Sequence, residues 1–124
     1  MQGTPVTLDE YFAGHDESRA LFAVVAGAIG ALGESEMRVT KSQVAFRRRV
    51  AFAWAWVPEQ YLKRDGLAPL VLTVDLHRRD GSPRWKSVVE PRSGRFTHHL
   101  EVFSAGDIDD EVLGWLREAW ENAA

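Results

Sequence analysis

The hydrophobic pattern of the chain changes its period at Glu36, and this change limits the folds that the chain can adopt. Before it, apolar residues recur every three or four positions from Leu21 to Leu32, which predicts an amphipathic helix that Gly33 ends. After it, apolar and polar residues alternate in stretches as far as Val102, which is the period of half-buried strands. The middle of the chain is therefore predicted to be a sheet that follows a helix.

Helices are predicted at both ends of the strand region. Thr7–Glu10 is a capping box that opens a short helix closed by Gly14, and Asp16 or Ser18 is expected to cap the longer helix. A last helix is predicted near the C-terminus, where acidic residues crowd the first turn. Its apolar stripe consists of Ile108, Val112, Leu116 and Trp120.

About six strands are predicted between the helices, at residues 36–41, 44–49, 50–57, 70–76, 84–90 and 96–102. The third is apolar on both faces, with Phe52, Trp54 and Trp56 expected on one face and alanines on the other. A loop is predicted at 59–69, with one helical turn at 60–62, and Trp85 and Val89 are expected on one side of the fifth strand. Short turns favour antiparallel pairing. The predicted fold class is α+β: an antiparallel sheet with the N-terminal and C-terminal helices packed on one face.

Length and composition restrict the class of protein further. A chain of 124 residues predicts a single domain over residues 1–124. The absence of cysteine excludes disulfides, thiolate zinc sites, iron–sulfur clusters and a cysteine nucleophile. No stretch approaches the roughly 20 apolar residues of a membrane span, and the N-terminal residues do not resemble a signal peptide. We therefore expect a soluble protein of the cytoplasm.

The net charge of −3 is unevenly distributed along the chain. Residues 1–37 carry a net charge of −5, residues 38–99 carry +8, and residues 100–124 carry −6. A basic centre between acidic ends indicates either an anion-binding face or acids that complement helix N-termini beside a basic sheet. The second interpretation also explains the acidic residues at the predicted helix starts.

The segment Val39–Arg48, VTKSQVAFRR, followed by a tryptophan-rich strand, is similar to the signature of an uncharacterised bacterial family of unknown function. Tyr11-Phe12 with Leu21-Phe22 matches the N-terminal pattern of that family, and His98–Glu101 with Trp115–Ala119 matches the C-terminal one. The resemblance covers nearly the whole chain and implies no established activity. The order of helix, sheet and helix also resembles frataxin-like iron-chaperone domains, which would imply weak iron binding.

A first candidate site lies around the turn between the first two strands. It comprises two uncharged polar residues and three cations: Ser42, Gln43, Lys41, Arg47 and Arg49. Cations with an oriented hydroxyl and amide can hold a carboxylate or a phosphate. The alternative is an exposed hairpin whose charges protect the strand edges.

A second candidate site is a metal centre on the polar face of the sheet. His99 and Glu101 share a face because side chains repeat every second residue, and so do Asp75 and His77. If the two strands pair, these four residues converge in a way that suits zinc or iron. His98 lies on the apolar face and is expected to be a core histidine bonded to a carbonyl or a carboxylate.

A third candidate combines aromatic and basic residues. Trp54, Trp56 and Trp85 are expected to be core residues, although tryptophans beside arginines can also stack bases. The basic residues of a nucleic-acid face would be Arg47, Arg48, Arg49, Arg78, Arg79 and Arg84. A pI near 5.8 argues against that function.

The sequence thus favours a small binding domain that takes a small anionic ligand or a protein partner. The alternatives are a frataxin-like protein that handles iron or zinc, and a nucleic-acid binder that uses the basic central sheet. No nucleophile–base pair or phosphate loop is visible, so binding is favoured over catalysis, and no cofactor is predicted.

Overall fold

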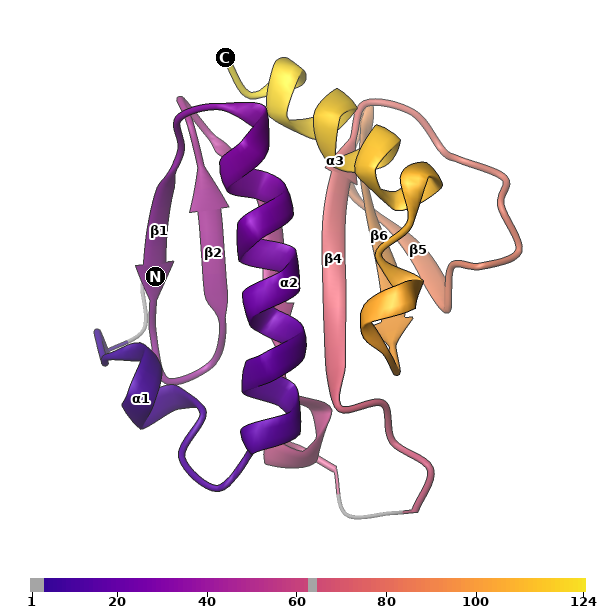
Figure 1. Ribbon diagram of the computed structural model, residues 1–124. Helices are drawn as coiled ribbons and strands as arrows, with labels where there is room; N and C mark the ends of the chain where they lie inside the picture. Colours follow the sequence, from indigo (N-terminus) through magenta and orange to yellow (C-terminus); the bar gives the residue numbers. More distant parts are fainter. Residues whose placement is uncertain (1–3, 63–64) are drawn as a thin grey trace.

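The protein is a six-stranded antiparallel sheet with helices on one side (Figure 1). The computed structural model describes residues 4–62 and 65–124. Residues 1–3 and 63–64, which belong to the predicted N-terminal segment and to the predicted loop at 59–69, lie outside that description. The predicted α+β class, with N-terminal and C-terminal helices packed on one face of the sheet, is confirmed.

The strand order is β1-β2-β3-β4-β6-β5. The helices are α1 (Leu8–Tyr11), α2 (Asp16–Leu32) and α3 (Asp110–Asn122), and the strands are β1 (Glu36–Val39), β2 (Val44–Arg47), β3 (Ala51–Trp56), β4 (Leu70–Leu76), β5 (Ser87–Arg92) and β6 (Arg95–Val102). Two 3-10 turns, η1 (Pro58–Gln60) and η2 (Ala105–Asp107), follow β3 and β6, and η1 begins two residues before the helical turn predicted at 60–62. Among the described residues, no helix combines the length and the apolar character that crossing a membrane requires.

The hydrophobic core lies between the sheet and the helices. The longer helices, α2 and α3, lie across the same face of the sheet and contact each other (Figure 1). The largest fully buried apolar side chains come from helices and central strands alike, and include Ile29, Phe52, Leu70, Leu72, Leu76 and Leu116. Burying each of them stabilises the fold by roughly 2 kcal/mol.

The two N-terminal helices begin in different ways. Thr7 opens α1 with the predicted capping box. His15 is the residue before α2 and makes no side-chain cap, so the prediction that Asp16 or Ser18 caps this helix is wrong. The Ser18 hydroxyl instead donates a hydrogen bond to the Pro69 carbonyl, 2.6 Å away. This bond connects α2 to the loop before β4.

A β-bulge changes which face of the sheet carries the aromatic residue at the start of β3. Phe46 pairs with Ala53, but the next residue, Arg47, pairs with Ala51, which leaves Phe52 as the extra residue. Phe52 belongs to the core cluster and is only 1% exposed. The expectation that it shares a face with the two tryptophans of β3 is therefore wrong, because a bulge interrupts the period of two.

The fifth strand begins later than predicted. The expected strand at 84–90 is β5, Ser87–Arg92, and the residues before it form a loop. Trp85 lies in this loop and packs against Trp115 of α3, with ring centroids 4.1 Å apart. Val89 is exposed, so the two residues do not share one side as expected.

Candidate functional site

The face of the sheet opposite α2 and α3, here called the open face, carries an aligned row of side chains. Within the described residues, all three α-helices lie on the other side of the sheet (Figure 1). The row crosses all six strands through successive cross-strand pairs and consists of Arg38, Ala45, Trp54, Thr73, His99 and Ser87. Trp54 and His99 are half-buried and Thr73 is buried, so the centre of the open face is shielded by its own side chains.

Hydrogen bonds connect the large side chains at the centre of the open face. Trp56 Nε1 donates to Thr73 Oγ1 at 3.3 Å, and Thr73 Oγ1 lies 2.8 Å from His99 Nδ1. Burial lowers the pKa of His99, and the neighbouring His98 lowers it further. A hydroxyl beside a neutral imidazole has the geometry of a nucleophile and its base. Thr73 is only 5% exposed, however, so this pair is better suited to fixing Trp56 than to attacking a substrate.

Asp75 is a buried carboxylate on the open face with one oxygen unused. The residue is 5% exposed, and its Oδ2 accepts from Arg95 Nε at 3.0 Å and from Arg95 Nη2. Its Oδ1 is buried, and no described group donates a hydrogen bond to it. Buried polar atoms without a partner are rare and require an explanation.

A cavity of about 320 Å³ lies against this carboxylate. Its lining comes from β3 and the residue before it, from β4, and from the adjoining ends of β5 and β6, and consists of Val50, Ala51, Trp54, Asp75, Pro91, Arg92, Arg95 and Thr97. None of the acids in the described part of the chain lies within ion-pair distance of Arg92. The cavity therefore offers an acceptor, an aromatic wall and a cation that is free to bind an anion.

The structure divides the predicted anion-binding group into two parts. Lys41, Ser42 and Gln43 form the turn before β2, whereas Arg47 and Arg49 lie at the far end of this strand. The four residues of β2 separate the two parts by about 13 Å, at roughly 3.3 Å per residue. Whether either part binds an anion stays a prediction.

Each part has its own surroundings. The Ser42 carbonyl accepts a hydrogen bond of 2.7 Å from the Tyr61 hydroxyl, which fixes the turn. At the other end, Arg47 borders a wider hollow of about 660 Å³, whose rim also carries the acids Glu34 and Glu36. Acids at this rim reduce its attraction for an anion.

The predicted metal ligands share the open face but do not converge. Lys86 Nζ lies 3.2 Å from Glu101 Oε2, and His99 is held by its contact with Thr73. Asp75 pairs with Thr97 across the β4–β6 ladder, and His77 lies beyond the end of β4. Within residues 4–62 and 65–124, no group of three or more metal-ligating side chains is placed to hold an ion.

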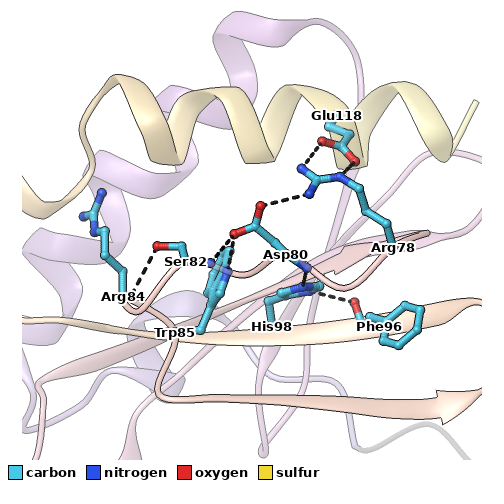
Figure 2. Close-up of polar contacts among 8 residues, drawn as sticks. All are labelled: Arg78, Asp80, Ser82, Arg84, Trp85, Phe96, His98 and Glu118. Atoms are coloured by element: carbon cyan, nitrogen blue, oxygen red, sulfur yellow. Dashed lines mark hydrogen bonds and ion pairs between the residues drawn. The ribbon is translucent and has the colours of Figure 1, made fainter.

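His98 is a core histidine, as expected from the sequence. It is fully buried beneath the ring of Trp85, and burial lowers its pKa. Nδ1 of His98 donates to the Phe96 carbonyl at 3.0 Å, because a carbonyl can only accept a hydrogen bond. Nε2 of His98 accepts from the Asp80 N–H at 3.0 Å, because a backbone N–H can only donate. Two backbone groups thus fix His98 as the neutral Nδ1–H tautomer (Figure 2).

Asp80 organises the loop between β4 and β5 (Figure 2). Its Oδ2 accepts from Trp85 Nε1 at 2.9 Å and from the Ser82 N–H at 3.0 Å, and its Oδ1 accepts from Arg78 Nη1 at 2.9 Å. Burial opposes ionisation of Asp80, but these hydrogen bonds outweigh it and lower the pKa to about 2. We interpret this cluster as a structural support, since its donors and acceptors are paired with one another.

Three of the six arginines considered for nucleic-acid binding lie along α3. Arg84 pairs with Asp109 and Glu111 at the start of this helix, and Arg48 lies over the ring of Trp120 near its end, 3.7 Å from the centroid. Arg78 is likewise paired, with acids on the loop and on α3. These arginines bind the helix and do not form one free basic face.

The tryptophans have two different roles. Trp85 is core, as expected, with 8% of its surface exposed. Trp54 and Trp56 are half-buried on the open face, so the expectation that they are core residues is wrong. No sequence pattern predicted the cavity beside Asp75. The available signal was the aspartate itself, in a strand whose seven residues are all buried.

Fold and site together define a small α+β domain in which the described helices leave one face of the sheet open, and a cavity with charged residues in its lining lies on that face. The chain belongs to the family described as "Domain of unknown function (DUF5655)", whose family model matches residues 8–123. Comparison with curated proteins gives no match, and comparison with solved structures gives none either.

Proposed function

We propose that the protein is a binding domain whose open face takes a small anionic ligand. The observation that carries this proposal is the cavity beside Trp54, which Arg92 and Arg95 border. Arg78 and Arg84, on the helix-covered side, are each paired with two carboxylates, whereas Arg92 has no such partner among the described residues. Free positive charge beside an aromatic wall is the chemistry that recognises an anionic organic molecule.

The size of the cavity favours a small ligand. Small-molecule pockets measure roughly 300–1,000 Å³, and a cavity of about 320 Å³ is at the lower end of that range. The same face could contact a nucleic-acid strand through Arg38 and Trp54, but a strand would require a longer basic groove.

Calorimetric titration with inorganic phosphate, citrate and ribose 5-phosphate tests the proposal. We expect at least one of them to bind, and the Arg92→Ala variant to bind it at least ten times more weakly, since a hydrogen bond to a charged group contributes about 1.5–3 kcal/mol. Arg117→Ala is the matched control, because Arg117 is an exposed cation on α3. If none of these anions binds, the proposal is wrong.

The sequence-predicted group gives a second arm of the same experiment. If Lys41→Ala combined with Arg47→Ala weakens binding and Arg92→Ala does not, the anion site is at the ends of β2 and not in the cavity. Both outcomes identify an anion-binding domain, and they differ in where the anion lies.

Frataxin-like handling of iron or zinc is the second candidate function. Its support is that His99 and Glu101 lie on the same face of β6. The geometry favours it less, because Lys86 and Thr73 already contact these two side chains. Stoichiometric binding of Fe²⁺ or Zn²⁺ that is lost in the His99→Ala, Glu101→Ala double variant would establish it in place of anion binding.

A further inference from the structure

We infer that the ligand of the open-face cavity is a mononucleotide, which is held by its base as well as by its phosphate. This inference rests on the proposed function and names the class of ligand. It comes from the contrast between two of the three charged groups that line the cavity, the buried carboxylate of Asp75 and the exposed cation of Arg92.

Asp75 requires a hydrogen-bond donor. Its Oδ1 is buried without a partner, while Arg95 occupies Oδ2. A bare anion such as phosphate would meet a like charge at this oxygen, and a bare cation would meet Arg92 and Arg95. The cavity therefore suits a molecule that has an N–H donor at one end and an anion at the other.

Trp54 indicates what lies between these two ends. It lines the same cavity as Asp75 and Arg92 and is only half-buried. An aromatic side chain of this kind stacks on flat heteroaromatic rings without regard to their identity. A base with an amino group combines the ring and the N–H, and its phosphate matches the planar fork of an arginine.

The volume of the cavity restricts the ligand to one nucleotide unit. A cavity of about 320 Å³ holds one ring system and leaves the phosphate at the mouth, where Arg92 is exposed. The exposed position of Arg92 also gives the phosphate access to solvent.

Calorimetry with AMP, GMP and CMP, compared with ribose 5-phosphate, tests this inference. We expect at least one of these nucleotides to bind at least ten times more tightly than ribose 5-phosphate. Asp75→Asn should reduce this preference at least fivefold and should not weaken the binding of ribose 5-phosphate, because the substitution removes a negative charge from the cavity. Glu121→Gln, which removes an exposed acid from α3, should change neither affinity.

Two further comparisons keep the test decisive if Asp75→Asn does not fold. Trp54→Ala should reduce the preference for the nucleotide in the same way, because it removes the stacking surface. On the wild-type protein, AMP should bind more tightly than purine riboside 5′-monophosphate, or GMP more tightly than IMP, since each pair differs by one amino group.

The outcomes separate this inference from the proposed function. If ribose 5-phosphate binds and the nucleotides bind no more tightly, the cavity is an anion site and the nucleotide inference is wrong. If inorganic phosphate, citrate, ribose 5-phosphate and the nucleotides all fail to bind, the proposed function itself is wrong. If the preference for nucleotides is unchanged in both Asp75→Asn and Trp54→Ala, the base binds at another site and the inference is wrong.

Discussion

Arg78 and Glu118 lie 40 residues apart in the chain and meet through two parallel hydrogen bonds. Arg78 Nε donates to one carboxylate oxygen of Glu118 and Nη2 donates to the other, both at 2.9 Å. These bonds connect the loop between β4 and β5 to the middle of α3 (Figure 2). The bidentate geometry sets the position of the loop above the sheet.

This pair explains part of the uneven charge of the sequence. The basic centre of the chain supplies Arg78, Arg84 and Arg48, and the acidic end supplies the carboxylates of α3 that contact the first two of them. On the helix-covered side, opposite charges in the sequence become ion pairs in the fold. On the open face, by contrast, Arg38 and Arg92 have no ion pair among the described residues, so their charges remain available to a ligand.

We predict that Asp80 contributes more to stability than Glu118 does. Asp80→Ala leaves the Trp85 Nε1–H and the Ser82 N–H without their acceptor, which should lower the free energy of unfolding by about 1–3 kcal/mol. Glu118→Ala removes an ion pair whose arginine is half exposed, and should cost at most about 1 kcal/mol. Urea unfolding of both variants measures the difference, and equal losses would contradict the role assigned to Asp80.

We predict that the protein loses stability as the pH falls from 7.5 to 5. The pKa of His98 in the folded state lies below its unfolded value of about 6.5, so the unfolded chain takes up a proton first. Proton uptake by the unfolded state lowers the free energy of unfolding with falling pH, and the buried His99 acts in the same direction.

Urea titrations at several pH values of this range check that prediction. His98→Gln should lose part of the pH dependence, while His77→Gln, at an exposed histidine beyond the end of β4, should keep all of it. If the free energy of unfolding of His98→Gln depends on pH as steeply as that of the wild type, His98 does not stay neutral in the fold.

We predict that two aromatic residues of β3 contribute to stability to different extents. Phe52→Ala should cost about 3–5 kcal/mol of stability, because Phe52 is 1% exposed in the core. Trp54→Ala should cost clearly less, because Trp54 is half-buried on the open face. Thermal unfolding of both variants measures this, and a smaller loss for Phe52→Ala would contradict the bulge.

The architecture of the fold could be predicted from the sequence, because the hydrophobic periodicity agrees with the residues that begin and end the helices. The change of period at Glu36, the capping box at Thr7 and the stop at Gly33 each have one local physical cause. The bulge at Phe52 has no such local signal, since it depends on how β2 and β3 align. One extra residue then reverses the face of an aromatic side chain, which the alternation of residues cannot show.

The candidate site was less predictable, because it depends on contacts between distant strands. His99 and Glu101 share a face, as alternation requires, but nothing in the sequence shows that Lys86 pairs with Glu101. The residues of the predicted anion-binding group are close together in the sequence, from Lys41 to Arg49. In the fold, β2 separates the residues at one end of this group from those at the other. Spacing along a strand gives the face of a residue, and only the strand pairing gives its neighbours.

We predict that Gly33 cannot be replaced by alanine without loss of stability. Its φ of +147° is rarely adopted by other residues, and a Cβ there would lie 2.5 Å from Cζ2 of Trp120. The indole cannot move away easily, because its Nε1 donates to the Glu34 carbonyl at 3.1 Å and Arg48 lies on its ring.

The matched control for this prediction is Gly30→Ala, near the end of α2. Nothing lies within 4 Å of a Cβ at this position, so the change should stabilise the helix by roughly 0.5–1 kcal/mol. Gly33→Ala should instead destabilise the protein by about 1–3 kcal/mol. Thermal unfolding of the two variants should therefore shift the melting temperature in opposite directions. A Gly33→Ala variant as stable as the wild type would mean that Trp120 is not held in place by Glu34 and Arg48, and that the contact between the ends of α2 and α3 is loose.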